Sequence, residues 1–141
     1  EDCNPCKEPI TKSVLKTLKD NLDQGLKDSR VEQELTGKLL GEAQWIAQTT
    51  HPLISPAVSI YASVIKDGVA GGLDAMKHLF RFLKGVKGHR LIKRKGNYSG
   101  LEVSSDADWA GLYKILGEKR SRSGIIIKYN GNVIRYNLTV I

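Results

Sequence analysis

The sequence predicts an α+β fold in which an N-terminal helical bundle is followed by a small antiparallel sheet. In the first part of the chain, apolar residues recur at the spacing of a helix. Beyond Gly88 that spacing changes to two residues, which is typical of strands. Asn130 and Gly131 then separate two β-branched runs and supply the two positive φ angles of a type I′ hairpin turn. We therefore expect a helical region at 1–88 and a β region at 89–141.

Four helices are expected in the helical region, because each of four segments has an apolar stripe and a polar face. They run from just after Pro9 to near Gly25, and over Val31–Gln48, Ala57–Ile65 and Leu73–Lys84. Ser55 is expected to cap the third helix, with Pro56 at its first position. Gly85 is placed to cap the C-terminus of the fourth.

Four strands are expected in the β region, because apolar and polar residues alternate there. They are placed at His89–Arg94, Leu101–Asp106, Gly124–Tyr129 and Val133–Leu138. The last two form the hairpin. Between the strands we expect a turn at Gly96–Gly100 and a loop at Ala110–Ser123.

Composition narrows the class of protein. The 141 residues suffice for one ordinary domain or two small ones. Hydrophobic residues make up 40% of the chain, which favours a folded protein. No apolar run reaches the roughly 18 residues that a membrane span needs, so we expect no membrane partner. No signal-peptide pattern opens the chain, which favours the cytoplasm or nucleus, while a leader already removed would leave secretion open.

Two short patterns need weighing, a cysteine pair and two N-glycosylation patterns, and the glycosylation patterns matter only if the chain is secreted. Cys3 and Cys6 are spaced as Cys-x-x-Cys, but no second cysteine pair or nearby histidine completes a zinc site. We favour an accidental pair over a redox site. Asn97-Tyr98-Ser99 and Asn137-Leu138-Thr139 fit the N-glycosylation pattern.

The net charge of +7 is concentrated in one segment. Between Ala75 and Leu101 there are eight Lys or Arg residues and no acid. A localised basic block favours a polyanion partner, and its alternative is a solvated, solubilising face. On the fourth helix the cations share one side, where they can follow successive phosphates. The candidate nucleic-acid-binding residues are Lys77, Arg81, Lys84, Lys87, Arg90 and Arg120.

Two carboxylates, Asp106 and Asp108, come at or just past the end of the strand that begins at Leu101. Oxygen ligands suit Mg²⁺, and paired carboxylates can hold it against a phosphodiester. Asp106 and Asp108 are therefore candidate metal ligands. The alternative is that they cap a turn.

The segment around these carboxylates resembles a known family. Ser105–Gly111 is similar to the Ser-Asp-Ala-Asp-Trp-Ala-Gly signature that opens the ribonuclease H region of Copia-type (Ty1/copia) retrotransposon polyproteins. Four other segments resemble motifs of that family and occur in the family's order. They are residues 2–9, 39–59, 74–85 and 119–124. The resemblance therefore covers nearly the whole chain.

The resemblance implies a thumb and connection region of reverse transcriptase at 1–88 and the first three strands of a ribonuclease H fold at 89–141. Members of the family are RNA-directed DNA polymerases with ribonuclease H activity. The resemblance implies that Asp106 matches the first Mg²⁺-binding carboxylate of the ribonuclease H site. The next acids of that site are missing here, so Asp106 is a remnant of an incomplete catalytic site. We expect no catalysis and no bound cofactor for this chain alone.

The expected function is that of a non-catalytic fragment of the polyprotein, which grips an RNA/DNA template-primer through a basic helix and loop. The alternative is a repurposed, transposon-derived protein that acts through protein–protein contacts. This alternative leaves open whether the protein is secreted. An enzymatic role would need carboxylates from another chain. The open sheet also needs cover from the helical half, a second copy or a partner. Its apolar residues are Ile125, Ile127, Ile134, Tyr136, Leu138 and Val140.

Overall fold

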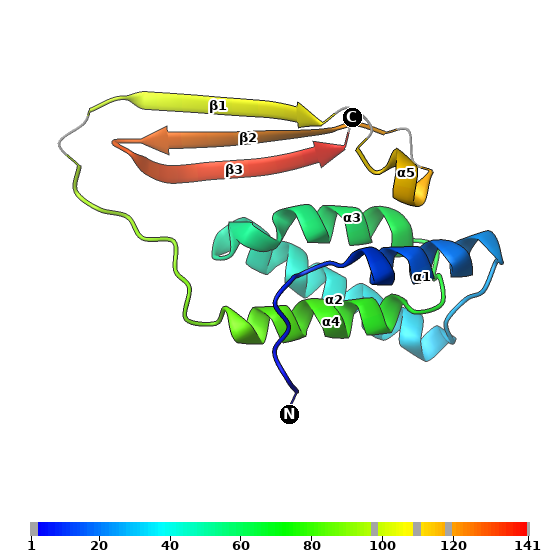
Figure 1. Cartoon of the computed structure of the whole chain (residues 1–141). Helices are drawn as coiled ribbons and strands as arrows, with labels where there is room; N and C mark the ends of the chain where they lie inside the picture. Colours follow the sequence, from blue (N-terminus) through cyan, green and yellow to red (C-terminus); the bar gives the residue numbers. More distant parts are fainter. Residues whose placement is uncertain (1–2, 97–98, 109–110, 118–119, 141) are drawn as a thin grey trace.

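A computed structural model describes residues 3–96, 99–108, 111–117 and 120–140, and within them the predicted α+β fold is confirmed. A helical bundle lies under a three-stranded antiparallel sheet, with α3 (Ser55–Ile65) next to the sheet and α4 (Gly72–Gly85) on the far side of the bundle (Figure 1). The bundle consists of α1 (Lys12–Asp23), α2 (Arg30–Thr49), α3 (Ser55–Ile65) and α4 (Gly72–Gly85). The sheet consists of β1 (Leu101–Asp108), β2 (Arg122–Tyr129) and β3 (Asn132–Val140).

The core of the bundle is formed by the apolar stripes of its helices. Its largest fully buried side chains are Leu18, Ile54, Tyr61, Met76 and Leu79. Each of the four aliphatic and methionine side chains among them contributes about 1.5–3 kcal/mol through removal from water. The hydroxyl of Tyr61 donates to the carbonyl of Pro9 at 3.2 Å, which satisfies its polar atom and fixes the N-terminal segment on the bundle. Burial raises the pKa of Tyr61 well above its usual range.

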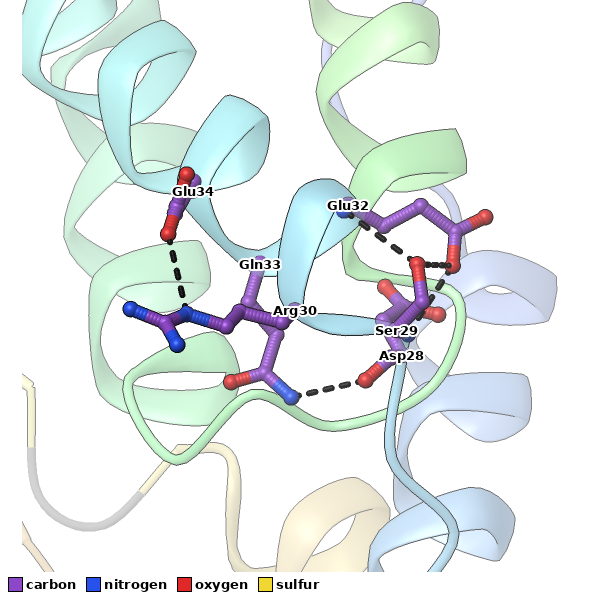
Figure 2. Close-up of polar contacts among 6 residues, drawn as sticks. All are labelled: Asp28, Ser29, Arg30, Glu32, Gln33 and Glu34. Atoms are coloured by element: carbon purple, nitrogen blue, oxygen red, sulfur yellow. Dashed lines mark hydrogen bonds and ion pairs between the residues drawn. The ribbon is translucent and has the colours of Figure 1, made fainter.

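The start of α2 is set by a capping box, as Figure 2 shows. The Ser29 hydroxyl accepts from the N–H of Glu32 at 3.3 Å, and the Glu32 carboxylate accepts from the N–H of Ser29 at 2.9 Å. Two N–H groups that a helix leaves unpaired are thus satisfied. The Ser29 hydroxyl also donates to the Glu32 carboxylate at 2.6 Å, and this bond, together with the one from the Ser29 N–H, holds the pKa of Glu32 below its usual range.

Asp28 connects the start of α2 to the start of α4. Its carbonyl accepts from the Gln33 side chain at 2.7 Å (Figure 2). Its carboxylate accepts from the N–H of Gly71 at 3.0 Å and from that of Leu73 at 3.4 Å. Gly71 is the N-cap of α4 and has no side chain to offer. Asp28 therefore caps α4 from another element, which the local sequence pattern does not predict.

The predicted caps of α3 and α4 are wrong by one position. Ser55 is the first residue of α3 and Ile54 its N-cap, because a 3₁₀ turn at Pro52–Ile54 precedes it. The Ser55 hydroxyl donates instead to the carbonyl of Ala47 at 3.4 Å. Gly85 is the last residue of α4, and a Cβ there would lie 3.2 Å from the Cβ of Pro5. Glycine at this position permits the close approach of the N-terminal segment.

The predicted hairpin is confirmed. Asn130 and Gly131 have φ angles of 49° and 74°, as a type I′ turn requires, and they join β2 to β3. β1 pairs with the other side of β2, so the sheet order is β1-β2-β3. β1 also continues two residues beyond the predicted end and includes Asp108.

Two predictions in the β region are wrong. His89–Arg94 is extended but pairs with no strand. The N–H of Arg94 donates to the side-chain oxygen of Asn132 at 2.6 Å, and the side-chain N–H of Asn132 donates to the carbonyl of Arg94 at 2.7 Å. One amide side chain thus satisfies both backbone groups of Arg94. The expected loop at Ala110–Ser123 contains helix α5 (Tyr113–Leu116) and the first residues of β2. Residues 110 and 118–119 of that loop lie outside the described part of the chain, and so do residues 97–98 of the expected turn.

One face of the sheet is covered by the bundle. Tyr136 donates to the carbonyl of Ala47, and burial raises its pKa. The guanidinium of Arg122 donates to the Ser63 hydroxyl of α3 at 3.3 Å. The cover is partial, because Ile134 remains 54% exposed and β1 is exposed along its whole length. Within the described residues, no helix has the length and apolar character to cross a membrane.

Candidate nucleic-acid interface

Helix α4 separates its apolar and cationic residues onto different sides. Met76, Leu79 and Phe82 are buried in the bundle. Lys77, Arg81 and Lys84 follow each other at intervals of four and three residues, which is about 4.5–6 Å along the helix axis. Helical spacing in the sequence therefore predicts the arrangement that these three side chains have.

The cationic side of α4 lies between two shallow hollows. Lys77 and Arg81 line a hollow of about 460 Å³ between α1 and α4. Lys84 and Lys87 line another, of about 390 Å³, next to the C-terminal turn of α2. We call Lys77, Arg81, Lys84 and Lys87 the α4 ridge. Arg90 follows on the extended segment that leads to β1 and is exposed.

The N-terminal segment, residues 3–9, lies along α4 and supplies carbonyl groups to the α4 ridge. Arg81 Nε donates to the carbonyl of Asn4 at 2.7 Å. Lys84 Nζ donates to the carbonyl of Cys3 at 2.9 Å. A carbonyl group is a neutral acceptor, so these hydrogen bonds orient the two cations without cancelling their charge.

Lys77 has an acidic neighbour. Its Nζ lies 3.3 Å from a carboxylate oxygen of Asp74, and the two side chains are 62% and 82% exposed. An exposed pair of this kind stabilises a protein by about 0–1 kcal/mol and is screened by salt. A phosphate can therefore replace Asp74 as the partner of Lys77 at little cost.

Cys6 and His78 connect the N-terminal segment to α4 through polar contacts. The Cys6 thiol donates to the carbonyl of His78 at 3.3 Å, and the His78 Nε2 lies 2.9 Å from the carbonyl of Glu8. Cys3 and Cys6 are both free thiols. Cys6 thus has a packing role in this structure.

Arg120 does not lie with the α4 ridge. It lines a cavity between α3, the end of α2 and β3, on the sheet side of the bundle (Figure 1). Lys66 lines the same cavity and was not among the residues that the sequence singled out. The signal in the sequence is that Lys66 directly follows the apolar positions of α3, where a cation is expected to be exposed.

Asp106 and Asp108 project from the same side of β1, as residues two positions apart on a strand do. An Asp106 oxygen accepts from the N–H of Ala107 at 2.9 Å, and an Asp108 oxygen accepts from that of Gly111 at 3.1 Å. Asp108 thus accepts a hydrogen bond from the backbone of the turn that follows it, as expected if it caps that turn. Among the described residues no group of three or more His, Cys, Asp or Glu could hold a metal ion. The sheet also lies on the opposite side of α3 from the α4 ridge (Figure 1).

Comparison of the sequence with known proteins shows which proteins the chain is related to. Over 73 residues, 52% of the chain, the sequence is 37% identical to the Retrovirus-related Pol polyprotein from transposon RE1 of Arabidopsis thaliana. The chain is a relative of retrotransposon Pol polyproteins. The Copia-type resemblance drawn from the sequence is thereby confirmed. The chain spans 5% of the length of the RE1 polyprotein.

Two other relatives cover more of the chain. It is 24% identical over 136 residues, 96% of its length, to the Uncharacterized mitochondrial protein AtMg00810 of Arabidopsis thaliana, and it spans 52% of that protein. It is 27% identical over 97 residues, 69% of its length, to the Secreted RxLR effector protein 161 of Plasmopara viticola, and it spans 66% of that protein. No family profile matches the chain. No solved structure matches it.

Proposed function

We propose that this Pol-related chain binds nucleic acid through the α4 ridge, without base specificity and without catalysis. The observation that carries the proposal is the alignment of Lys77, Arg81 and Lys84 along one side of a helix whose other side is buried. Lys87 and Arg90 extend the cationic path toward β1. In a polyprotein context, an RNA/DNA template-primer is the ligand that this path fits.

The chemistry of the ridge suits phosphates rather than bases. Lys and Arg ammonium and guanidinium groups contact phosphate oxygens, and such contacts position a duplex without reporting its sequence. Binding of this kind releases condensed counterions, so affinity falls steeply as salt increases. The carbonyl groups of Cys3 and Asn4, which accept from Lys84 and Arg81, are neutral acceptors, and a phosphate forms stronger hydrogen bonds with such donors.

The test is the affinity of the protein for a short RNA/DNA hybrid, measured by fluorescence anisotropy across a salt series. The double variant Arg81→Glu/Lys84→Glu should lower the slope of log affinity against log salt by about 2, since each lost phosphate contact lowers it by about 1. Lys27→Glu/Lys38→Glu is the matched control, because both residues are exposed and lie outside α4. Binding that does not respond to salt, or equal weakening by both double variants, contradicts the proposal.

The proposal assigns no hydrolysis to this chain alone. One carboxylate pair on β1 falls short of a two-metal site, which needs further acidic ligands. Incubation of the hybrid with the protein and Mg²⁺ should therefore leave the RNA strand intact. Mg²⁺-dependent cleavage that is lost in Asp106→Asn would instead show that the remaining ligands come from a second chain.

A second candidate function is supported by the similarity to the Secreted RxLR effector protein 161. In this second hypothesis, the present chain is a repurposed, transposon-derived protein that is secreted and acts through protein–protein contacts. Under that hypothesis Cys3 and Cys6 are oxidised, and the basic residues meet an acidic protein. A free-thiol count on secreted material and a pull-down from nuclease-treated extract separate it from the first proposal.

A further inference from the structure

β3 is an edge strand of the described sheet, because only β2 pairs with it. An edge strand presents unpaired N–H and C=O groups along its free side. The cavity of about 510 Å³ next to α3 is lined by five successive residues of β3, Tyr136 to Val140. Successive residues point to opposite faces of a sheet, so a cavity lined by all five lies at the edge of the strand.

A second cavity continues the first along β3. It has a volume of about 460 Å³ and is lined by β3 residues Val133 to Asn137, by the end of α2 and by the extended segment before β1. Tyr136 and Asn137 line both cavities. We call the two cavities together the β3 groove. It follows eight strand residues, or about 27 Å at 3.4 Å per residue.

The β3 groove is cationic. Lys66 and Arg120 line its first cavity, and Lys93 and Arg135 line its second. No Asp or Glu is among the described residues that line either cavity. The wall opposite β3 offers hydroxyl and amide side chains from α2 and α3. They are Gln44, Gln48, Ser55, Ser59 and Ser63.

We propose that the β3 groove binds an extended acidic peptide segment, which adds to the sheet as a strand beside β3. The free edge of β3 offers donors and acceptors in alternation, and a polypeptide strand can pair with both. A phosphodiester chain offers acceptors alone, so the edge favours a peptide over nucleic acid. The four cations of the groove select acidic side chains on that peptide.

The β3 groove is separate from the α4 ridge, because α4 lies on the far side of the bundle from the sheet (Figure 1). The two surfaces come nearest in sequence at Arg90 of the nucleic-acid path and Lys93 of the groove. The other edge of the sheet has the opposite character. β1 is exposed throughout, carries Glu102, Asp106 and Asp108, and has no cation. An acidic peptide is repelled there, so its binding is confined to β3.

The test uses a fluorescent peptide of alternating Val and Asp residues, with a Val-Lys peptide of equal length as control. Lys66→Glu/Arg120→Glu should weaken binding of the Val-Asp peptide by about tenfold or more, because like charges then face each other. Lys12→Glu/Lys16→Glu is the matched control, since it changes the charge equally on exposed positions of α1, outside the groove. The control should leave the affinity unchanged.

Two further measurements distinguish strand addition from simple charge attraction. Methylating alternate backbone nitrogens of the peptide should abolish binding, because it removes the N–H groups that pair with β3. Hydrogen exchange of amides in Tyr136–Val140 should slow when the unmodified peptide is present, and an RNA/DNA hybrid should not displace the peptide. The proposal is overturned if the peptide binds without slowing exchange in β3. It is also overturned if the protein forms concentration-dependent dimers in which β1 of a second copy fills the groove.

Discussion

Replacing Asp28 with alanine tests whether α4, and with it the α4 ridge, is held in place from the start of α2. The variant loses hydrogen bonds to the N–H groups of Gly71 and Leu73, at 3.0 and 3.4 Å. An N-terminal cap contributes about 1 kcal/mol. A carboxylate near the positive end of the helix dipole adds about 0.3–1 kcal/mol. We therefore expect the free energy of unfolding to fall by about 1.3–2 kcal/mol.

Urea denaturation followed by circular dichroism measures this change, with m-values compared to confirm the same extent of unfolding. Asp28→Asn keeps an acceptor without the charge and should fall between the wild type and Asp28→Ala. The control is Asp23→Ala, which removes an exposed pair with Lys19 at 3.4 Å and should cost no more than about 0.5 kcal/mol. An Asp28→Ala cost as small as that of the control would refute the capping argument.

Three other predictions concern single residues. The pKa of Glu32 is lowered by its hydrogen bonds from Ser29, so the stability that it supplies is present above its ordinary pKa of 4.5 and is lost as pH falls through the lower folded value. In urea titrations at different pH values, Glu32→Gln should therefore lose less stability than the wild type as the pH falls. The pKa of Tyr61 is raised by burial, so its stability is present below the ordinary value of 10.0 and is lost as pH rises further. Tyr61→Phe should remove that alkaline loss and cost about 1 kcal/mol at neutral pH, since the carbonyl of Pro9 loses its donor. Gly131→Ala should destabilise the protein by about 1 kcal/mol in thermal unfolding, because φ at this residue is 74°.

Each of these has an outcome that contradicts it. A loss of stability at low pH that is unchanged in Glu32→Gln means that other carboxylates control it. Tyr61→Phe that still loses stability above pH 10.0 assigns the alkaline effect to another group. Gly131→Ala at wild-type stability means that the hairpin turn adopts another geometry in solution.

The helices and the hairpin are predictable because the signals for them are local. The predicted helix Val31–Gln48 lies one residue inside each end of α2, because a periodic apolar stripe runs through that segment and a capping box formed by Ser29 and Glu32 lies at its start. Asn130 and Gly131 carry their own turn geometry. The cationic side of α4 follows from spacing alone.

The rest depends on contacts between distant segments. Asp28 lies 43 residues from Gly71, and no pattern around either residue indicates the hydrogen bond. The segment His89–Arg94 alternates like a strand, but the side chain of Asn132 satisfies its backbone groups at Arg94. Arg120 carries the same charge as the α4 cations, and only the fold separates it from them by placing it beside β3.

The outer strand β1 has a consequence for how copies of the protein meet at high concentration. Its unpaired side is a template on which another chain could extend the sheet. Glu102, Asp106 and Asp108 place negative charge along it, so two such strands repel each other when they approach. The acidic residues, of which Glu102 lies 3.8 Å from Lys128 of β2, thus disfavour the pairing of two β1 strands, and replacing Asp106 and Asp108 with threonine or valine should promote concentration-dependent association.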